Sequence, residues 1–374
     1  MRNWRVPREG GFWLAVAAVT VFAGWLKTIN LLLLFGYLML GLFAINALVA
    51  RAMARRVSAA RVPLGPGFAG QSTPRAADVR NRTPRPAVVS VRESSPVHDA
   101  AWFLPSLAGG DIRRIATEFI ATRRGHYIVS PLVASSGYPF GLIHYSHAVA
   151  DAETLDVLPA RGQVDLGRLR RWLIRTGVGD ANTRRPIRHH SIHQADVRGV
   201  RPYRPGDSLR DVHWRTTARR GSLMVREYDS ADPLDLLLVV EPWLPADPTP
   251  ADRQRLEDAL SLAASVFWAW GHGDETPEAT LVVAGGGGSR SGRATEGFVR
   301  QALTLLAGVQ GTAAPHELPM DRLRTRTNRC VRMVVSSRSA AGLAGDLRAR
   351  TGLPFVPADP SMRFAWYRPP GVAP

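Results

Sequence analysis

The stretch LDLLLVV, residues 234–240, is a run of apolar side chains interrupted only by Asp235. A continuous apolar run of this length is typical of a strand that is buried on both faces, as in a parallel sheet. Downstream, apolar runs of strand length alternate with segments of helical periodicity, which predicts a Rossmann-like parallel sheet covered by helices on both faces. The predicted elements are helices at 252–270, 295–307 and 340–350 and strands at 279–284, 331–336 and 353–356.

Upstream of this strand lies RPYRPGDSLRDVHWRTTARRGSLMVREYD, residues 201–229, which we call the signature. It carries more charge than any other segment of the chain. Pro205 fixes φ, Gly206 permits a reversal and Asp207 favours a cap, so a turn is predicted here. Residues 223–228 alternate between apolar and polar side chains, which predicts a half-buried strand.

Between this turn and this strand, the signature predicts a helix over 208–220. Ser208 and Asp211 have the spacing of a capping box, with Asp in place of the usual Glu or Gln. Gly221 is well placed to end the helix in a left-handed conformation. One stripe of such a helix holds Leu209, Val212 and Thr216.

Several blocks of the signature closely resemble the bacterial domain-of-unknown-function 58 family: VRPYRPGD from 200, RDVHW from 210, ARRG from 218 and LMVRE from 223. RRGHY from 123 and YPFGL from 138 resemble a second segment of that family, with Tyr138 where Asp is usual. The residues that we single out as a binding surface are Arg201, Tyr203, Pro205, Gly206, Asp207, Arg210, Asp211, Trp214, Arg215, Arg219, Gly221 and Glu227.

The resemblance implies a membrane-anchored protein with a von Willebrand factor A-like domain after the signature. It also implies association with MoxR-type AAA+ ATPases and a role in assembling or maturing protein complexes. Domains of the A type often bind a divalent cation through an Asp-x-Ser-x-Ser loop after the first strand. This chain has Glu241 there and neither serine, so we expect no metal and no cofactor.

The sequence pattern of residues 51–160 predicts a β-sandwich-like module. Short apolar runs at 87–91, 115–121 and 126–129 are separated by Pro and Gly. The segment 65–85 is either part of this β structure or an ordinary loop. From 161 to 230 we expect a connector that carries the signature, and from 231 to 374 the α/β domain.

The connector begins with a predicted helix from residue 165, in which Leu166, Leu169 and Leu173 recur at helical spacing. A polar, basic run follows as far as 193. Its histidines, His189, His190 and His193, lack a nearby Cys or acidic partner at a recognised spacing, which argues against a zinc site.

Two uncharged apolar runs, 12–26 and 31–50, predict a two-helix transmembrane hairpin, residues 1–50, with a tight turn between them. Arginines flank both outer ends, whereas the turn has only Lys27. The positive-inside rule therefore places both ends, and the bulk of the chain, in the cytoplasm at the inner membrane. The alternative is a cleaved signal peptide, but the apolar region is about three times too long for one.

Composition fits a folded cytosolic protein better than a secreted or disordered one. The chain is 374 residues long, is 45% hydrophobic and has a formal net charge of +17. Nearly all of the basic residues are Arg, which reduces the weight of the charge as evidence for nucleic-acid binding. Cys330 is the only cysteine, so no intrachain disulfide is possible, and we expect it to be buried.

Three functional alternatives remain for the signature. Asp207, Asp211 and His213 could form the acid and base groups of a hydrolase, although no nucleophile is evident. The Arg-rich segment could bind nucleic acid or anionic lipid.

Outside the signature, GGGG at 285–288 lacks the Gly-Lys-Ser of a phosphate loop and indicates a flexible connection.

We favour a third alternative, a non-enzymatic scaffold. In it, the signature is a strut between domains with an Arg-rich docking face, and Trp214 is a packed anchor.

Overall fold

The computed structural model describes residues 3–63, 65–177, 197–203, 212–228, 234–273, 276–313, 323 and 330–371. The chain divides into two compact units, residues 1–160 and 161–374.

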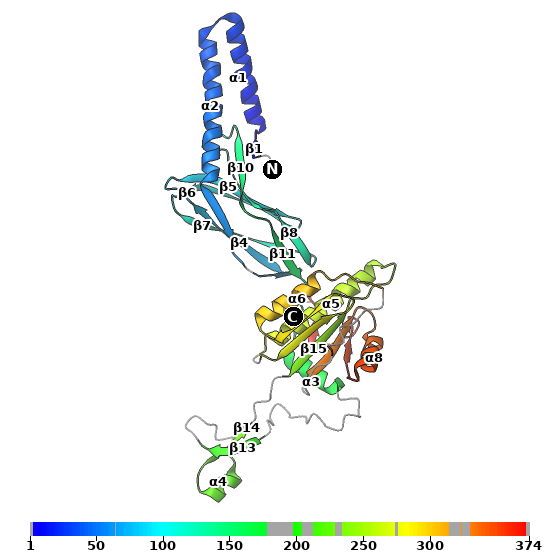
Figure 1. Ribbon diagram of the computed structural model, residues 1–374. Coiled ribbons are helices and arrows are strands. Elements are labelled where there is room, and N and C mark those ends of the chain that lie inside the picture. The colour runs from blue at the N-terminus through cyan, green and yellow to red at the C-terminus, as the bar shows by residue number, and fades with distance from the viewer. Residues whose placement is uncertain are drawn as a thin grey trace. The chain divides into compact units, whose positions relative to one another are not determined.

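The first unit begins with two antiparallel helices, α1 (Arg8–Lys27) and α2 (Asn30–Arg55) (Figure 1). Both are long and apolar enough to cross a membrane. They are joined at Thr28, whose φ of 51° ends α1 in the left-handed conformation. Gly36 on α2 allows close packing, because a Cβ there would lie 2.5 Å from Val21 on α1. The prediction of two apolar helices joined by a tight turn is confirmed.

The rest of the first unit is the β module, residues 57–158, whose strands form three sheets, one of them together with β1 from before α1. Side chains of the β2-β4-β7 sheet and of the sheet that contains β5, β6 and β9 share one hydrophobic core. The five-stranded sheet is β1 (Trp4–Arg5), β10 (His144–Ala150), β9 (Leu132–Ser136), β5 (Ala87–Ser95) and β6 (His98–Leu107). The other two are β2 (Val57–Arg61), β4 (Ser72–Asn81) and β7 (Ile112–Ile120), and β3 (Gly67–Phe68), β11 (Glu153–Leu158) and β8 (Gly125–Val129).

Strand β4 shows that the loop reading of 65–85 is wrong. It is ten residues long and pairs with β2 on one side and β7 on the other. Its buried positions include Thr73, Ala77, Val79 and Asn81. These alternate as in a strand, but the side chains are small or polar, so the apolar alternation in the sequence is weak.

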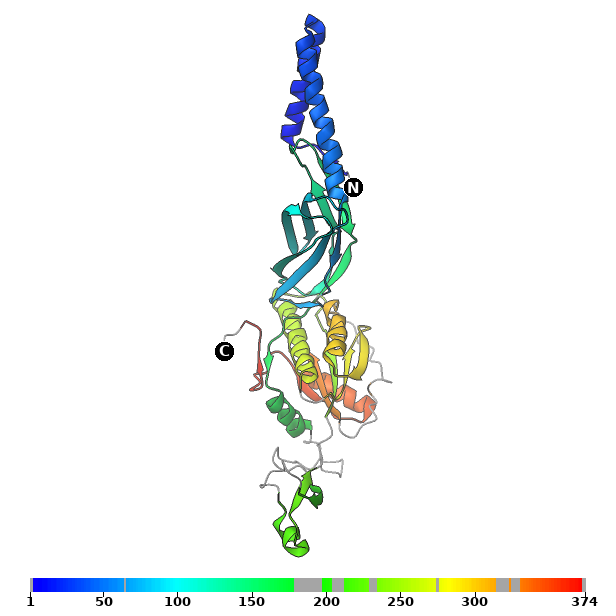
Figure 2. The same ribbon diagram turned by 90° about the vertical axis from the view of Figure 1, so that its left-hand side faces the viewer.

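The second unit contains a five-stranded sheet in the order β17-β16-β15-β18-β19. Helices α5 and α6 pack against each other on one face, and α8 packs against the strands on the other (Figure 2). The elements are β15 (Asp235–Glu241), α5 (Pro250–Gly271), β16 (Glu278–Val283), β17 (Gly288–Arg293), α6 (Glu296–Ala307), β18 (Cys330–Ser336), α8 (Ala340–Thr351) and β19 (Val356–Ala358).

Three details of the predicted sheet are corrected. The sheet is mixed, because β17 runs antiparallel to β16. The glycines before β17 form a tight hairpin turn, with φ of 77° at Gly285 and 81° at Gly286, which is a defined reversal and not a flexible connection. The last strand begins at Val356, at the end of the predicted range 353–356.

Smaller elements complete the second unit. Strands β12 (Gln163–Val164) and β20 (Tyr367–Arg368) pair, and α3 (Leu166–Gly177) forms as predicted with Leu169 and Leu173 buried. Cys330 is half-buried at the start of β18. The three histidines considered for zinc lie outside the described residues.

Candidate functional site

The signature folds as a hairpin with a short helix. Strand β13 (Val197–Pro202) pairs antiparallel with β14 (Met224–Tyr228). The amide of Tyr203 donates to the carbonyl of Leu223 over 2.9 Å, and the amide of His213 donates to the carbonyl of Met224 over 2.8 Å. Strand β14 is predicted correctly, but β13 is missed, because 197–202 mixes Gly, Pro and Arg with its two valines.

The helix of the signature, α4 (Trp214–Arg220), is shorter than predicted. Val212 lies before it in a bridge to Val225 and is buried, so it is extended and not helical. His213 caps the helix, and its Nδ1 accepts a hydrogen bond from the amide of Thr216 over 3.2 Å. Ser208, which was predicted to cap the helix, lies outside the described residues. Gly221, with φ of 67°, ends the helix as predicted.

The outward surface of α4 is aromatic and basic. Trp214 is 65% exposed, and Arg215, Arg219 and Arg220 are also exposed. The prediction that Trp214 is a packed anchor is wrong for the part of the chain that the structure describes. The hairpin's own core is instead Val212, Met224 and Val225, with Met224 donating its amide to Thr217 Oγ1 over 3.0 Å.

The structure brings together only part of the predicted site. Arg201 and Tyr203 are half-buried next to the β13–β14 pairing, and Glu227 lies in β14 opposite Gly199. Pro205, Gly206, Asp207, Arg210 and Asp211 lie outside the described residues.

A second cluster of polar side chains lies at the carboxyl end of the central strands β15 and β18. Strand β15 has its sequential neighbour β16 on one side and β18 on the other, so the strand order reverses between β15 and β18. In open α/β sheets such a reversal opens a crevice where ligands bind. Glu241 ends β15, Ser336 ends β18, and Arg338 follows.

Glu241 is 1% exposed, and both of its carboxylate oxygens are engaged. Arg338 donates from Nη2 to Oε1 over 2.7 Å and from Nε to Oε2 over 3.1 Å, and Ser336 Oγ donates to Oε2 over 2.6 Å. The Arg338 guanidinium also lies 5.6 Å from the centre of the Trp243 ring. A fixed guanidinium therefore neutralises the carboxylate, in a bidentate geometry.

Residues 199–351, which include most of the hairpin and most of this sheet, match the family described as "Protein of unknown function DUF58". The chain contains a DUF58 domain. A curated relative is the uncharacterized protein YeaD of Bacillus subtilis, which is 30% identical over 82 residues. That match covers 22% of this chain and 18% of YeaD, so the chain spans less than a fifth of that relative's length.

Two solved structures share short, distant similarity with this chain. One is the alkylpurine DNA glycosylase AlkC of Pseudomonas fluorescens, with 18% identity, coverage of 31% of this chain and 33% of AlkC, and a TM-score of 0.21. The other is a CARDB domain from Pyrococcus furiosus, with 13% identity, coverage of 25% and 94%, and a TM-score of 0.19. At these scores neither likeness informs the fold or the function of the DUF58 domain.

Replacing Arg338 with alanine is expected to lower the free energy of unfolding of the DUF58 sheet by about 2 kcal/mol, because the buried Glu241 carboxylate then loses its bidentate guanidinium partner. Hydrogen exchange of β15 and β18 in the full-length protein measures this change. Arg350→Ala is the matched control, since its exposed pair with Asp346 is worth about 0.5 kcal/mol or less. Equal effects of the two variants would contradict a structural role for the Glu241 pair.

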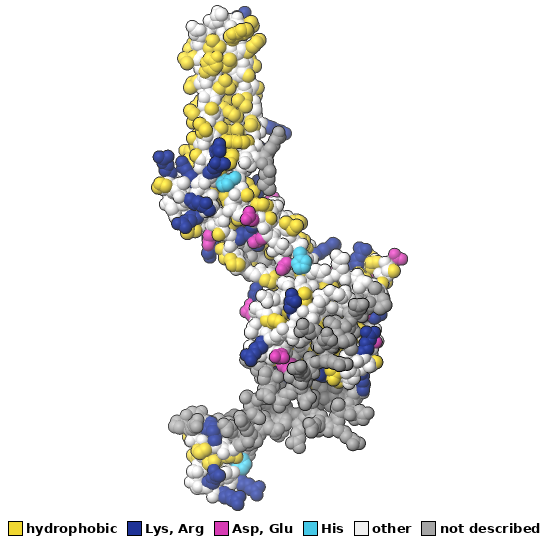
Figure 3. All heavy atoms as spheres, viewed as in Figure 1, with side chains coloured by type: hydrophobic (Ala, Val, Ile, Leu, Met, Phe, Trp, Pro, Cys, Tyr) yellow, Lys and Arg dark blue, Asp and Glu magenta, His cyan; other side chains and the backbone are white. Residues whose placement is uncertain are grey.

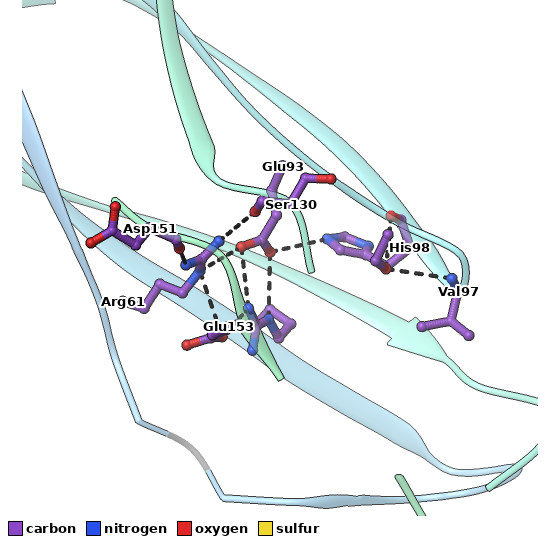
Figure 4. Close-up of polar contacts among 9 residues, drawn as sticks. Arg61, Glu93, Val97, His98, Ser130, Asp151 and Glu153 are labelled. Atoms are coloured by element: carbon purple, nitrogen blue, oxygen red, sulfur yellow. Dashed lines mark hydrogen bonds and ion pairs between the residues drawn. The ribbon is translucent and has the colours of Figure 1, made fainter. Parts of the chain in front are cut away.

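Outside the DUF58 domain, the β module buries an ion cluster that sequence reasoning missed (Figure 4). Glu93 on β5 is 2.8 Å from Arg61 Nε and 3.1 Å from Arg75 Nη2, and Arg75 is also 2.6 Å from Glu153. These side chains come from all three sheets, so the cluster ties the sheets together. Burial by itself raises the pKa of the Glu93 carboxyl, but hydrogen bonds from Arg61 and Arg75 hold that pKa below its usual range.

The sequence does hold a signal for this cluster. Ala87, Val89, Val91 and Glu93 are alternate residues of β5 and all are buried. The period-2 pattern therefore places one carboxylate on the apolar face of a strand, where a charge needs a partner.

Proposed function

We propose that this chain is a non-enzymatic, membrane-anchored scaffold whose DUF58 domain docks a protein partner through α4. The observation that carries the proposal is the exposure of Trp214 and three arginines on a helix of seven residues. The cap at His213 and the hydrogen bond from the Met224 amide to Thr217 engage His213 and Thr217 within the hairpin. The exposed side chains are therefore available to a partner, and Trp and Arg are the residue types enriched at interface hot spots.

Membrane anchoring is supported by α1 and α2, which carry exposed apolar side chains along their length. The outer ends of both helices carry arginine, which favours a cytoplasmic location for both ends and for the DUF58 domain.

The fold supports the finer assignments. Two sheets of the β module share one core, as a sandwich-like module requires. The sheet of the DUF58 domain has helices on both faces and reverses its strand order between β15 and β18, as a von Willebrand factor A-like domain would. Glu241 then stands at the metal-loop position of such a domain, paired with Arg338.

The partner that we propose is a MoxR-type AAA+ ATPase, which the family resemblance implies, working with this chain in the assembly or maturation of protein complexes. The surface of α4 is basic, so the matching surface on the ATPase should be acidic with an apolar recess for Trp214. Nucleic acid and anionic lipid are the alternatives for the same arginines. A further alternative is a hydrolase, in which Asp207, Asp211 and His213 supply the acid and base groups.

Changing Trp214 and Arg215 together to alanine is expected to weaken binding of a purified MoxR-type ATPase from the same genome at least tenfold. Loss of a hot-spot Trp with an adjacent Arg typically costs more than about 2 kcal/mol of binding free energy, which is the reason for the tenfold expectation. The affinity is measured with the full-length protein in nanodiscs. Arg80→Ala with Arg113→Ala is the control, since it removes two exposed charges from the β module.

Three outcomes would contradict the docking proposal. Equal binding by the double variant and the control would exclude α4 as the docking surface. Tight, strongly salt-dependent binding of duplex DNA, lost in the α4 variant, would favour a nucleic-acid role. Substrate turnover that depends on His213 would favour the hydrolase.

A further inference from the structure

Asn46 is a polar residue within the apolar run of α2, and its side chain is fully buried. Its Nδ2 donates to the carbonyls of Gly137 and Tyr138, both over 2.9 Å. Its Oδ1 accepts from the amides of Leu142 and Ile143, over 2.8 and 3.3 Å. One side chain thus satisfies four backbone groups of the loop between β9 and β10, residues 137–143, which we call the β9–β10 loop.

The β9–β10 loop also contacts α1. A Cβ added to Gly10 would lie 1.8 Å from the carbonyl oxygen of Leu142, so only glycine permits this approach. Within the loop, the amide of Gly141 donates to the carbonyl of Gly137 over 2.8 Å. The loop therefore lies against the first turn of α1 and the C-terminal half of α2.

The position of Asn46 sets the depth of this loop. The uncharged run 31–50 has 20 residues and is about 30 Å long as a helix, which equals the hydrocarbon thickness of a typical bilayer. Asn46 lies five residues before Arg51, about 7 Å toward the hydrocarbon side. Irregular backbone at this depth needs its polar groups satisfied by protein, and Asn46 does this.

The side chains around the loop match a membrane interface. Tyr138 and Phe140 are 45% and 55% exposed although both are aromatic. Arg51 and Arg55 follow the apolar run, with guanidinium carbons 6.0 and 5.7 Å from the centre of the Tyr145 ring. Figure 3 shows Lys and Arg side chains gathered just below the apolar helices, between them and the acidic side chains on this face. Aromatic rings and arginines at this level are typical of the boundary between headgroups and acyl chains.

We propose that the β9–β10 loop is a third membrane contact, with Tyr138 and Phe140 inserted at the boundary between lipid headgroups and acyl chains. The inference rests on the proposed anchoring by α1 and α2. It adds that the β module itself lies against the bilayer and is not held away from it.

The test places a bimane fluorophore at Phe140→Cys in a Cys330→Ser background, in the full-length protein in nanodiscs of phosphatidylethanolamine and phosphatidylglycerol. Quenching by lipids with a nitroxide near the headgroup is compared with quenching by aqueous iodide. Leu48→Cys, in the apolar run of α2, is the membrane control. Ile128→Cys on β8, which is as exposed as Leu48, is the aqueous control.

We expect the label at 140 to be quenched by the nitroxide lipid at least threefold more than the label at 128, and to be protected from iodide. A label at 140 that behaves like the one at 128 would overturn the proposal, with quenching at 48 showing that the helices are still anchored. Lack of lipid quenching at 48 would instead overturn the anchoring itself. Protection at 140 from both quenchers would indicate a protein covering the loop, and would also overturn the proposal.

Discussion

Replacing Glu93 with glutamine is expected to lower the free energy of unfolding of the β module by about 3 kcal/mol. The change removes the carboxylate that pairs with both Arg61 and Arg75, whose side chains are 10% and 15% exposed. Removing one partner of a buried ion pair typically costs about 3–5 kcal/mol. The lower end of that range is expected here, because Glu153 stays paired with Arg75 and Arg61. Hydrogen exchange of β4 and β5 in the full-length protein measures the loss.

Asp78→Asn is the matched control for Glu93→Gln. Asp78 pairs with Arg114 on the surface of the same module, where an ion pair is worth about 1 kcal/mol at most. Acid provides a second readout. Because the folded pKa of Glu93 is below its unfolded value of about 4.3, its stabilisation is present above that pH and is lost as the pH falls through the folded pKa. A Gln variant as stable as the parent at pH 7 would contradict the role of the cluster.

Replacing Asn46 with alanine is expected to speed hydrogen exchange in the β9–β10 loop about a hundredfold. The change removes the partner of four backbone groups, and each buried group left unsatisfied costs about 1 kcal/mol or more. Because costs at one shared site are not additive, we take a combined loss of about 3 kcal/mol, which gives the hundredfold change. Mass spectrometry of peptides covering 137–143 measures it.

Asn30→Ala is the control for Asn46→Ala, since Asn30 is the exposed first residue of the same helix. It should leave exchange in the loop unchanged. If Asn46→Ala also leaves the loop unchanged, Asn46 does not hold it, whereas faster exchange throughout α2 would mean that the helix itself is disrupted.

The helices and inner strands of this chain were predictable because their sequences have one dominant period. The apolar run around Leu236 has the length and composition of a buried strand, and α5 covers the whole range expected for it and extends slightly beyond both ends. The predictions failed where pairing partners decide the structure. Val212 is extended because Val225 lies opposite it, and β17 forms because a glycine turn folds it back on β16.

The residues of the candidate sites likewise divide into those that local sequence predicts and those that depend on distant partners. Gly221 was predictable because the requirement for a left-handed residue is local. Asn46 and Glu93 were not, because the hydrogen-bond partners of Asn46 lie 91 or more residues away in sequence and the arginine partners of Glu93 lie 18 or more residues away. Each is a polar residue in an apolar pattern. The pattern therefore indicates that the residue is buried and needs a partner, but it does not indicate which residue the partner is. The exposure of Trp214 depends likewise on the tertiary arrangement around α4.

Strand β1 has a mechanical consequence for the helical hairpin. Trp4 and Arg5, just before α1, pair with Tyr145 and His144 on β10, and α2 continues within two residues into β2. The outer ends of α1 and α2 are therefore both connected to strands of the β module. A single connection between the helices and the module would allow rotation about it. Two connections that are both fixed in close-packed sheets restrict this rotation and transmit torque. A twisting force applied to the β module would then rotate both helices together.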